Sequence, residues 1–281
     1  MKNLVSVIIP TFNFAHFIEE TIDSVLKQTY KTTEIIVVDD GSTDKTQSVL
    51  NKYVSLPNFR LITSTNSGAC IARNRGVLAS RGEYLLFLDA DDVIHESMLE
   101  KLLTSLQVND QRTRLAYCAY SLAGETSHRY FNAFEQTESS SLQDWFWDNV
   151  GKTPFPPSVT IIHRSLLAEA GMWDTALKSP SEDFDFFRRL AKYTLFKGCN
   201  ENLVARKKHA ESLTRRSPNL YFEDNIRAVR RMFSEDLISV GFAKRQKAWI
   251  KIHLNFIKHS IVIRDSKLTL RVVKSFLAYF K

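Results

Sequence analysis

Short apolar runs alternate with stretches of helical periodicity through the first 120 residues of the chain. Buried strands are predicted at Val5 to Pro10, Glu34 to Asp39, Phe59 to Thr63 and Glu83 to Asp89. Between them, apolar residues recur at helical spacing in residues 17–28, 43–53 and 69–80. Strands that alternate with helices in this way are typical of βαβ units. We therefore expect an α/β fold with a Rossmann-like, mostly parallel sheet flanked by helices.

The second half of the chain is less regular. Later strands are predicted at Leu115 to Tyr120, Val159 to His163, Leu195 to Lys197 and Leu203 to Lys207, and helices at Ser165 to Ala170 and Asp183 to Lys192. Gly124 to Gly151 is polar and aromatic, which is typical of loops with short helices. Tyr221 to Lys281 has only helical patterns. We expect a catalytic-type α/β domain over residues 1–220 and a basic helical C-terminal extension over residues 221–281.

Composition and charge narrow the class of protein. Of the 281 residues, 44% are hydrophobic and 25% are charged, which indicates a folded chain and excludes a disordered one. Residues 221–281 carry 13 Lys and Arg against 5 Asp and Glu, so the net charge of +7 comes from this extension. A neutral body with a basic, aromatic-rich end favours an anionic membrane surface over nucleic acid as partner. A solvated helix packed on the domain is the alternative.

The sequence also bears on compartment and redox state. No apolar run reaches the roughly 18 residues that cross a bilayer, and no signal-peptide cleavage site follows the first apolar run. We expect a cytoplasmic protein that attaches peripherally to the inner face of the plasma membrane. Cys70, Cys118 and Cys199 lie far apart without a CxxC pair, which argues against a disulfide framework and a zinc site.

Acidic residues gather just after the predicted strands. The first strand ends in Pro10-Thr11-Phe12-Asn13, the second in Asp39-Asp40-Gly41-Ser42 and the fourth in Asp89-Ala90-Asp91-Asp92. Ligands of open parallel sheets bind at the carboxyl ends of strands, where five carboxylates would repel one another without a cation. A divalent cation takes such oxygen ligands and keeps open positions for phosphate. Tight turns and helix capping are the alternative uses of these aspartates.

Five segments in register resemble the family-two glycosyltransferases of the GT-A fold. They are SVIIPTFN, VVDDGSTD, GACIARNRG, GEYLLFLDADD and SEDFDFFRRL, and the resemblance covers about Ser6 to Leu213. It implies an inverting enzyme that uses Mn²⁺ or Mg²⁺ and a DxD motif. Such an enzyme moves a hexosyl or N-acetylhexosaminyl group from a nucleotide diphosphate donor, foremost a UDP-sugar, to a hydroxyl of an acceptor. The acceptor would be a glycan or lipid-linked glycan in bacterial surface polysaccharide synthesis, such as lipopolysaccharide or capsule.

Two other functions remain open at this point. A nucleotidyltransferase also uses an α/β sheet with a carboxylate-bound metal, but it needs a Gly-rich basic loop after the first strand, and Pro10-Thr11-Phe12-Asn13-Phe14 has none. An inactive, membrane-associated sugar-nucleotide-binding protein would have degraded metal and base positions, whereas these positions are intact. We therefore favour the transferase.

The resemblance assigns the donor-binding residues. They would be Pro10, Thr11, Phe12, Asp39, Asp40, Arg73, Asp89 and Ala90. Phe12 stands where many relatives have Tyr, which keeps ring stacking but removes a hydroxyl contact. Asp40 is expected to accept the hydrogen bond of a uracil ring N–H. For Arg73 the alternative is an exposed helix arginine.

The resemblance also implies the metal ligands. They would be Asp91, Asp89 and His209, with Asp91 in direct contact and Asp92 as a cap or an outer partner. An exposed basic residue is the alternative for His209.

The general base would be Asp183. Ser179-Pro180-Ser181-Glu182 has the pattern of a helix capping box, which explains Glu182 but leaves Asp183 without a structural task. The resemblance places the base that deprotonates the acceptor hydroxyl at Asp183, with Asp185 as second choice. Aromatic side chains that could stack on sugars, with core packing as the alternative, are Trp145, Trp147, Phe155 and Trp173.

Overall fold

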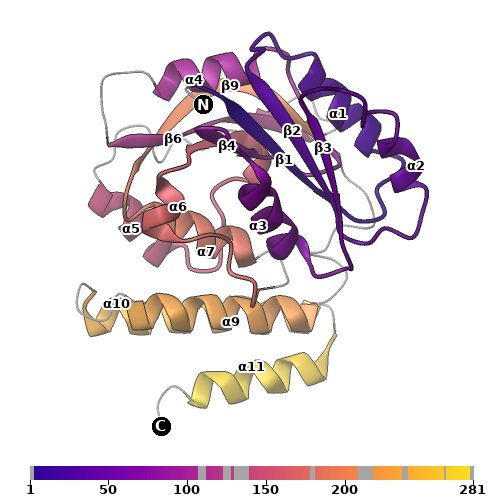
Figure 1. Cartoon of the computed structure of the whole chain (residues 1–281). Coiled ribbons are helices and arrows are strands. Elements are labelled where there is room, and N and C mark those ends of the chain that lie inside the picture. The colour runs from indigo at the N-terminus through magenta and orange to yellow at the C-terminus, as the bar shows by residue number, and fades with distance from the viewer. Residues whose placement is uncertain are drawn as a thin grey trace.

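In the computed structural model, one curved sheet lies between helices, and the C-terminal helices form a further layer beneath it (Figure 1). The structure describes residues 3–106, 112–122, 128–129, 139–177, 181–207, 218–235, 240–262 and 264–278. The strands are β1 Val5–Thr11, β2 Thr33–Asp39, β3 Phe59–Thr63, β4 Tyr84–Phe87, β5 Asp92–Ile94, β6 Thr113–Leu122, β7 His128–Arg129, β8 Thr160–His163 and β9 Leu195–Arg206. The helices are α1 Ile18–Leu26, α2 Thr46–Leu50, α3 Ala69–Ala79, α4 Met98–Leu106, α5 Ser139–Asp148, α6 Leu166–Ala170, α7 Ser181–Leu190, α9 Pro218–Glu235, α10 Phe242–Val262 and α11 Ser266–Ala278, with a 3₁₀ turn at Pro157–Val159.

The sheet confirms the predicted α/β class. Its order is β3-β2-β1-β4-β8-β6-β9-β5, with β7 beside β6. Strands β3, β2, β1 and β4 are mutually parallel, β8 runs antiparallel between β4 and β6, and β9 is parallel to β6. Six of the nine strands in the described residues therefore point the same way, which places the carboxyl ends of β1, β2, β4 and β9 at one edge.

The central strands of the N-terminal half are buried on both faces and are mostly apolar. Residues 5–9 of β1 and 34–39 of β2 are all buried, as expected for a parallel sheet covered by helices. Gly76 lets α3 approach β1 closely, since a Cβ at this position would lie 2.3 Å from Cγ2 of Ile8. A larger residue at position 76 would therefore push α3, and with it Arg73, away from the sheet.

Three strands differ from the prediction. One of them, His128–Arg129, pairs with β6 in the segment that was expected to form loops with short helices. Leu195–Arg206 is one strand of 12 residues rather than two short ones, because shifts in its register with β6 accommodate the polar residues in its middle. Asp92–Ile94 pairs with the far end of β9, with Asp92 opposite Arg206. Periodicity does not reveal a three-residue strand whose partner lies more than a hundred residues away.

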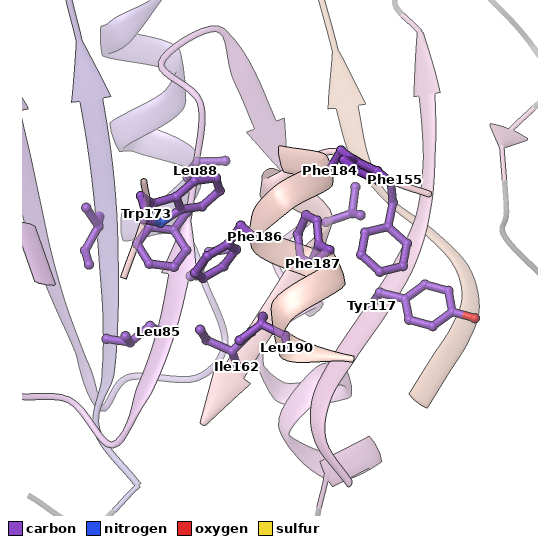
Figure 2. Packing of buried hydrophobic residues seen from close by; sticks show 14 of the residues in the cluster. Leu85, Leu88, Tyr117, Phe155, Ile162, Trp173, Phe184, Phe186, Phe187 and Leu190 are labelled. Carbon is purple, nitrogen blue, oxygen red and sulfur yellow. The ribbon is translucent and has the colours of Figure 1, made fainter. Parts of the chain in front are cut away.

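Helix α7 is embedded in the core of the second half (Figure 2). Its three phenylalanines, Phe184, Phe186 and Phe187, are buried. Trp173 stacks on Phe186 with ring centroids 4.0 Å apart, and Phe155 meets Phe187 edge to face at 4.9 Å. This packing fixes the position of the helix, so the polar residues of its first turn are held in place.

The C-terminal helices pack on this half. Helix α9 spans the boundary predicted at residue 220, and Trp249 of α10 and Leu268 of α11 are buried in the same hydrophobic cluster as α7. Ion pairs join α9 to α7, with Arg188 2.9 Å from Glu235. Among the described residues, no helix is both long and apolar enough to cross a membrane.

Candidate active site

The turn after β2 is built around two buried carboxylates. Asp39 Oδ1 accepts a hydrogen bond from the backbone N–H of Ser42 (3.0 Å). Asp40 accepts bonds from the backbone N–H groups of Ser67 (2.9 Å) and Gly68 (2.7 Å), and so holds the loop before α3 against the sheet. The predicted bond from Asp40 to a uracil N–H would compete with these two bonds and stays a prediction.

The end of β1 offers both a ring and a free acceptor. The ring of Phe12 is 37% exposed, although it follows a buried strand. Thr11 is buried, and its Oγ1 has no hydrogen-bond partner among the described residues, while Pro10 is half-buried. An exposed ring beside buried polar atoms suits the stacking of a planar base.

The acidic segment after β4 is divided between exposed and buried carboxylates. Asp89 and Asp91 keep partial exposure, whereas Asp92 is buried and pairs with Arg206 Nε at 3.2 Å. Burial raises the pKa of Asp92 to about 7, against the opposing effect of Arg206. Ala90 is buried, and its carbonyl accepts a hydrogen bond from Thr21 Oγ1 (2.9 Å). Asp92 thus ties β5 to β9, and Asp89 and Asp91 remain partly exposed.

Arg73 connects this segment to α7. Its guanidinium donates to Asp89 Oδ1 (3.0 Å), lies 3.5 Å from Glu182 Oε1 and stacks over the ring of Trp173 at 4.4 Å. Only 5% of Arg73 is exposed, so the alternative of an exposed helix arginine is wrong. The Arg73 guanidinium therefore links the segment after β4 to the first turn of α7.

The first turn of α7 holds two carboxylates whose pKa values are raised. Burial raises the pKa of Asp183 to about 7, and burial together with the neighbouring Asp183 charge raises the pKa of Glu182 well above its usual range. Asp183 Oδ1 and Glu182 Oε2 are shielded from solvent and have no hydrogen-bond partner among the described residues. A raised carboxyl pKa together with an unpaired oxygen favours a proton-accepting role.

Asp185, the second choice for the base, has different surroundings. It is fully buried, and its two oxygens pair with Arg188 (3.2 Å) and Arg189 (2.8 Å). Arg231 of α9 lies 3.8 Å from the same carboxylate. These partners leave Asp185 with a structural task, so the geometry favours Asp183 as base.

The donor set after β4 is chemically suited to a hard divalent cation. Asp89 and Asp91 supply partly exposed carboxylate oxygens, and a magnesium ion is commonly held by one or two carboxylates plus substrate phosphates. Among the described residues, no three Asp, Glu, His or Cys side chains form a metal cluster. His209 lies outside the described residues. The residues therefore fit a cation whose coordination is completed by the donor.

Two features of the site were missed by sequence reasoning. Arg206, at the end of β9, reaches Asp92 and lies 4.0 Å from Asp89 Oδ2. Applying the strand-end rule to the last strand would have found it. The contact of Glu182 with Arg73 was missed as well. The predicted capping box stays a prediction, because its Ser179 and Pro180 lie outside the described residues.

The candidate sugar-stacking rings mostly serve the core. Trp147 stacks on Phe233 of α9, and Phe155 stacks on Tyr117 of β6. Trp147, Phe155 and Trp173 are each 98% buried, so they offer no face to a sugar. Trp145 is half-buried.

Known sequences that are similar to this chain are glycosyltransferases. The family model described as "Glycosyl transferase family 2" matches residues 6–170. An uncharacterized glycosyltransferase of Rickettsia typhi is 31% identical over 217 residues, which is 77% of this chain and 67% of that protein. The poly(ribitol-phosphate) β-N-acetylglucosaminyltransferase TarP of Staphylococcus aureus is 45% identical over 102 residues, 35% of this chain and 31% of TarP.

Solved structures share the fold. TarS 1–349 of S. aureus in complex with UDP-GlcNAc matches with a TM-score of 0.74 and 19% identity, covering 97% of this chain and 80% of that one. The mannosyltransferase PcManGT of Pyrobaculum calidifontis in complex with GDP-Man and Mn²⁺ matches with a TM-score of 0.61 and 18% identity, covering 98% and 74%. At this level of identity the likeness concerns the fold.

Proposed function

The chain belongs to glycosyl transferase family 2, and from this premise we propose that it transfers a sugar from a UDP-sugar to a glycan hydroxyl with inversion. A glycan or lipid-linked glycan of a bacterial surface polysaccharide is the proposed acceptor class. Support for the donor comes from TarS, which was solved with UDP-GlcNAc, and for the acceptor from TarP, whose name specifies a poly(ribitol-phosphate). The family assignment argues against the nucleotidyltransferase alternative.

The observation that carries the mechanism is the pair of properties of Asp183. Its Oδ1 has no partner among the described residues, and burial raises its pKa to about 7. An acceptor hydroxyl that donates to this oxygen would satisfy it and would pass its proton to the carboxylate as the hydroxyl oxygen attacks the anomeric carbon. The sugar–phosphate bond breaks on the opposite face, so the configuration inverts.

Donor binding is assigned to the strand ends. Phe12 supplies a ring for the base, and the turn carrying Asp39 and Asp40 lies beside it for the ribose and base edges. Arg73 offers a buried positive charge to the diphosphate while it holds Asp89 in place. These residues bind and orient the donor so that the anomeric carbon faces α7.

Asp89 and Asp91 would hold Mn²⁺ or Mg²⁺, and His209 is the predicted third ligand. When bound, such a cation neutralises the charge that develops on the departing diphosphate. PcManGT, a structural neighbour, was solved with GDP-Man and Mn²⁺.

Donor hydrolysis and transfer test this proposal directly. The purified full chain should release UDP from one member of a panel of UDP-, GDP- and dTDP-sugars when Mn²⁺ or Mg²⁺ is present. EDTA and Asp91→Ala should both abolish the release, and Leu78→Glu on the exposed face of α3 serves as control. Release from a GDP- or dTDP-sugar alone would refute the uridine preference, and undiminished release in EDTA would refute the metal.

A further inference from the structure

The outward face of α10 carries an apolar stripe with lysines along one side of it. Ala243, Ile250, Leu254 and Ile261 recur at spacings of seven, four and seven, which places them on one line of the helix. Ile250, Leu254 and Ile261 are 40%, 50% and 61% exposed, respectively. A shallow hollow of about 590 Å³ runs along this line, and among its lining residues are Lys247, Lys251 and Lys258.

Exposed apolar side chains concentrate on these last two helices. Of the 13 large apolar side chains exposed in the described residues, seven lie on α10 and α11, which are 34 of the chain's 281 residues. Those on α11 are Leu270, Val273 and Leu277. Such a concentration exceeds the scattered exposure normal for a soluble surface and marks an interaction site.

The charge of the two helices limits what can cover them. Together α10 and α11 carry eight Lys and Arg and no Asp or Glu. Two copies of this face would repel each other, because neither offers an acidic partner. Apolar side chains flanked by lysines fit a surface that is negatively charged outside and hydrocarbon inside, where lysine stems can lie along the boundary.

We propose that the exposed face of α10, defined by Ile250, Leu254, Ile261, Lys247 and Lys258, docks the protein on an anionic lipid surface. The apolar line enters the headgroup boundary, and the lysines contact lipid phosphates. Lys244 and Lys251 are anchored to α5 through the Asp144 carboxylate and the Asp148 carbonyl, so the orientation of α10 relative to the α/β body is fixed. This proposal is independent of the transferase chemistry.

Sedimentation with lipid vesicles tests the proposal on the full chain. Binding to vesicles containing phosphatidylglycerol should exceed binding to pure phosphatidylcholine vesicles, and it should weaken with added salt. Lys247→Glu with Lys258→Glu should reduce binding at least about tenfold, given about 1 kcal/mol for each lysine near the surface. Ile250→Glu with Leu254→Glu should reduce vesicle binding similarly. Leu78→Glu replaces another exposed apolar residue, on α3, and should leave vesicle binding unchanged.

Four outcomes of these experiments would contradict lipid docking by α10. Absence of binding to either vesicle by the unaltered chain would overturn the proposal, as would binding that survives both double variants. A monomer–dimer equilibrium that the Ile250→Glu, Leu254→Glu variant abolishes would assign the face to self-association instead. Salt-sensitive binding to duplex DNA without binding to vesicles would assign it to nucleic acid. Unchanged thermal melting of each variant excludes misfolding as the cause.

Discussion

Asp183 and Asp185 lie two residues apart on α7, and their surroundings differ in kind. Asp185 is fully buried between Arg188 and Arg189, with Arg231 of α9 nearby. Asp183 has an oxygen without any partner among the described residues and a pKa raised to about 7 by burial. One helix therefore carries a carboxylate that is satisfied by the protein and another that is left for a ligand.

This difference shows how one helix can be held rigidly in the core and still present a carboxylate to a ligand. Phe184, Phe186 and Phe187 are buried and hold α7 in the core, and the ion pairs of Asp185 fix the rotation of the helix against α9. Asp183 itself stays half-buried, but its Oδ1 is shielded from solvent, which costs stability and prepares the group for proton transfer.

The largest effect is expected for Asp183→Asn. The amide cannot take a proton, so kcat for transfer should fall about 10²- to 10⁴-fold, the usual contribution of a general base. Calorimetric titration with UDP should give an affinity close to that of the unaltered chain, since the residues proposed to bind the donor lie on the strand ends and α3 rather than on α7. Transfer at the normal rate in this variant would remove Asp183 from the mechanism.

Asp185→Asn should instead lower stability. Replacing this fully buried carboxylate removes the only carboxylate paired with Arg189 among the described residues and leaves Arg188 with Glu235 alone, which should lower the free energy of unfolding by about 3 kcal/mol. Urea denaturation measures this loss, and kcat of the folded fraction should change much less than in Asp183→Asn. A variant as stable as the original but inactive would exchange the roles of the two aspartates.

The pH dependence of kcat should carry the signature of Asp183. Because its pKa is raised to about 7, the reactive carboxylate predominates above pH 7, and kcat should fall about tenfold per unit well below that value. Rates of transfer between pH 5 and 9, at saturating donor and acceptor, provide the measurement. A flat profile down to pH 5 would contradict a base with a raised pKa.

The smallest effect is expected for Arg231→Gln. Arg231 is 39% exposed and pairs with Asp174 at 2.7 Å and Glu235 at 2.7 Å, so its loss should cost about 1 kcal/mol or less. The midpoint of thermal unfolding should fall by a few degrees at most while donor KM stays constant. A loss as large as that of Asp185→Asn would mean that α9, rather than α7 itself, holds the cluster together.

Much of the fold could be predicted because its first half repeats one simple pattern. Continuous apolar positions predict buried strands such as residues 34–39, and periodic apolar positions predict the helix at residues 18–26. The pairing of Asp92 with Arg206 could not be predicted, since it joins residues far apart in the chain and depends on the irregular register of β9.

For the site, the position of Asp89 and Asp91 directly after a strand predicts that they lie at the edge of the sheet. The surroundings of the other site residues depend on contacts between distant segments. Nothing in the sequence indicates that Asp40 is occupied by the backbone of Ser67 and Gly68, or that Arg73 is buried under Trp173. Such features arise from packing between elements, and local patterns do not encode them.

Strand β9 carries extra residues relative to β6 between Cys199 and Asn202, whereas its far end pairs regularly with β5. Side chains alternate strictly between the two faces of a strand, so removing one residue there would turn every later side chain to the other side. Arg206 would then leave the carboxylate edge, and Lys207 would take its position in the strand. The irregularity in the middle of β9 therefore determines which face of the sheet each later side chain occupies. Insertions or deletions at this point should be tolerated only when they change the chain length by two residues.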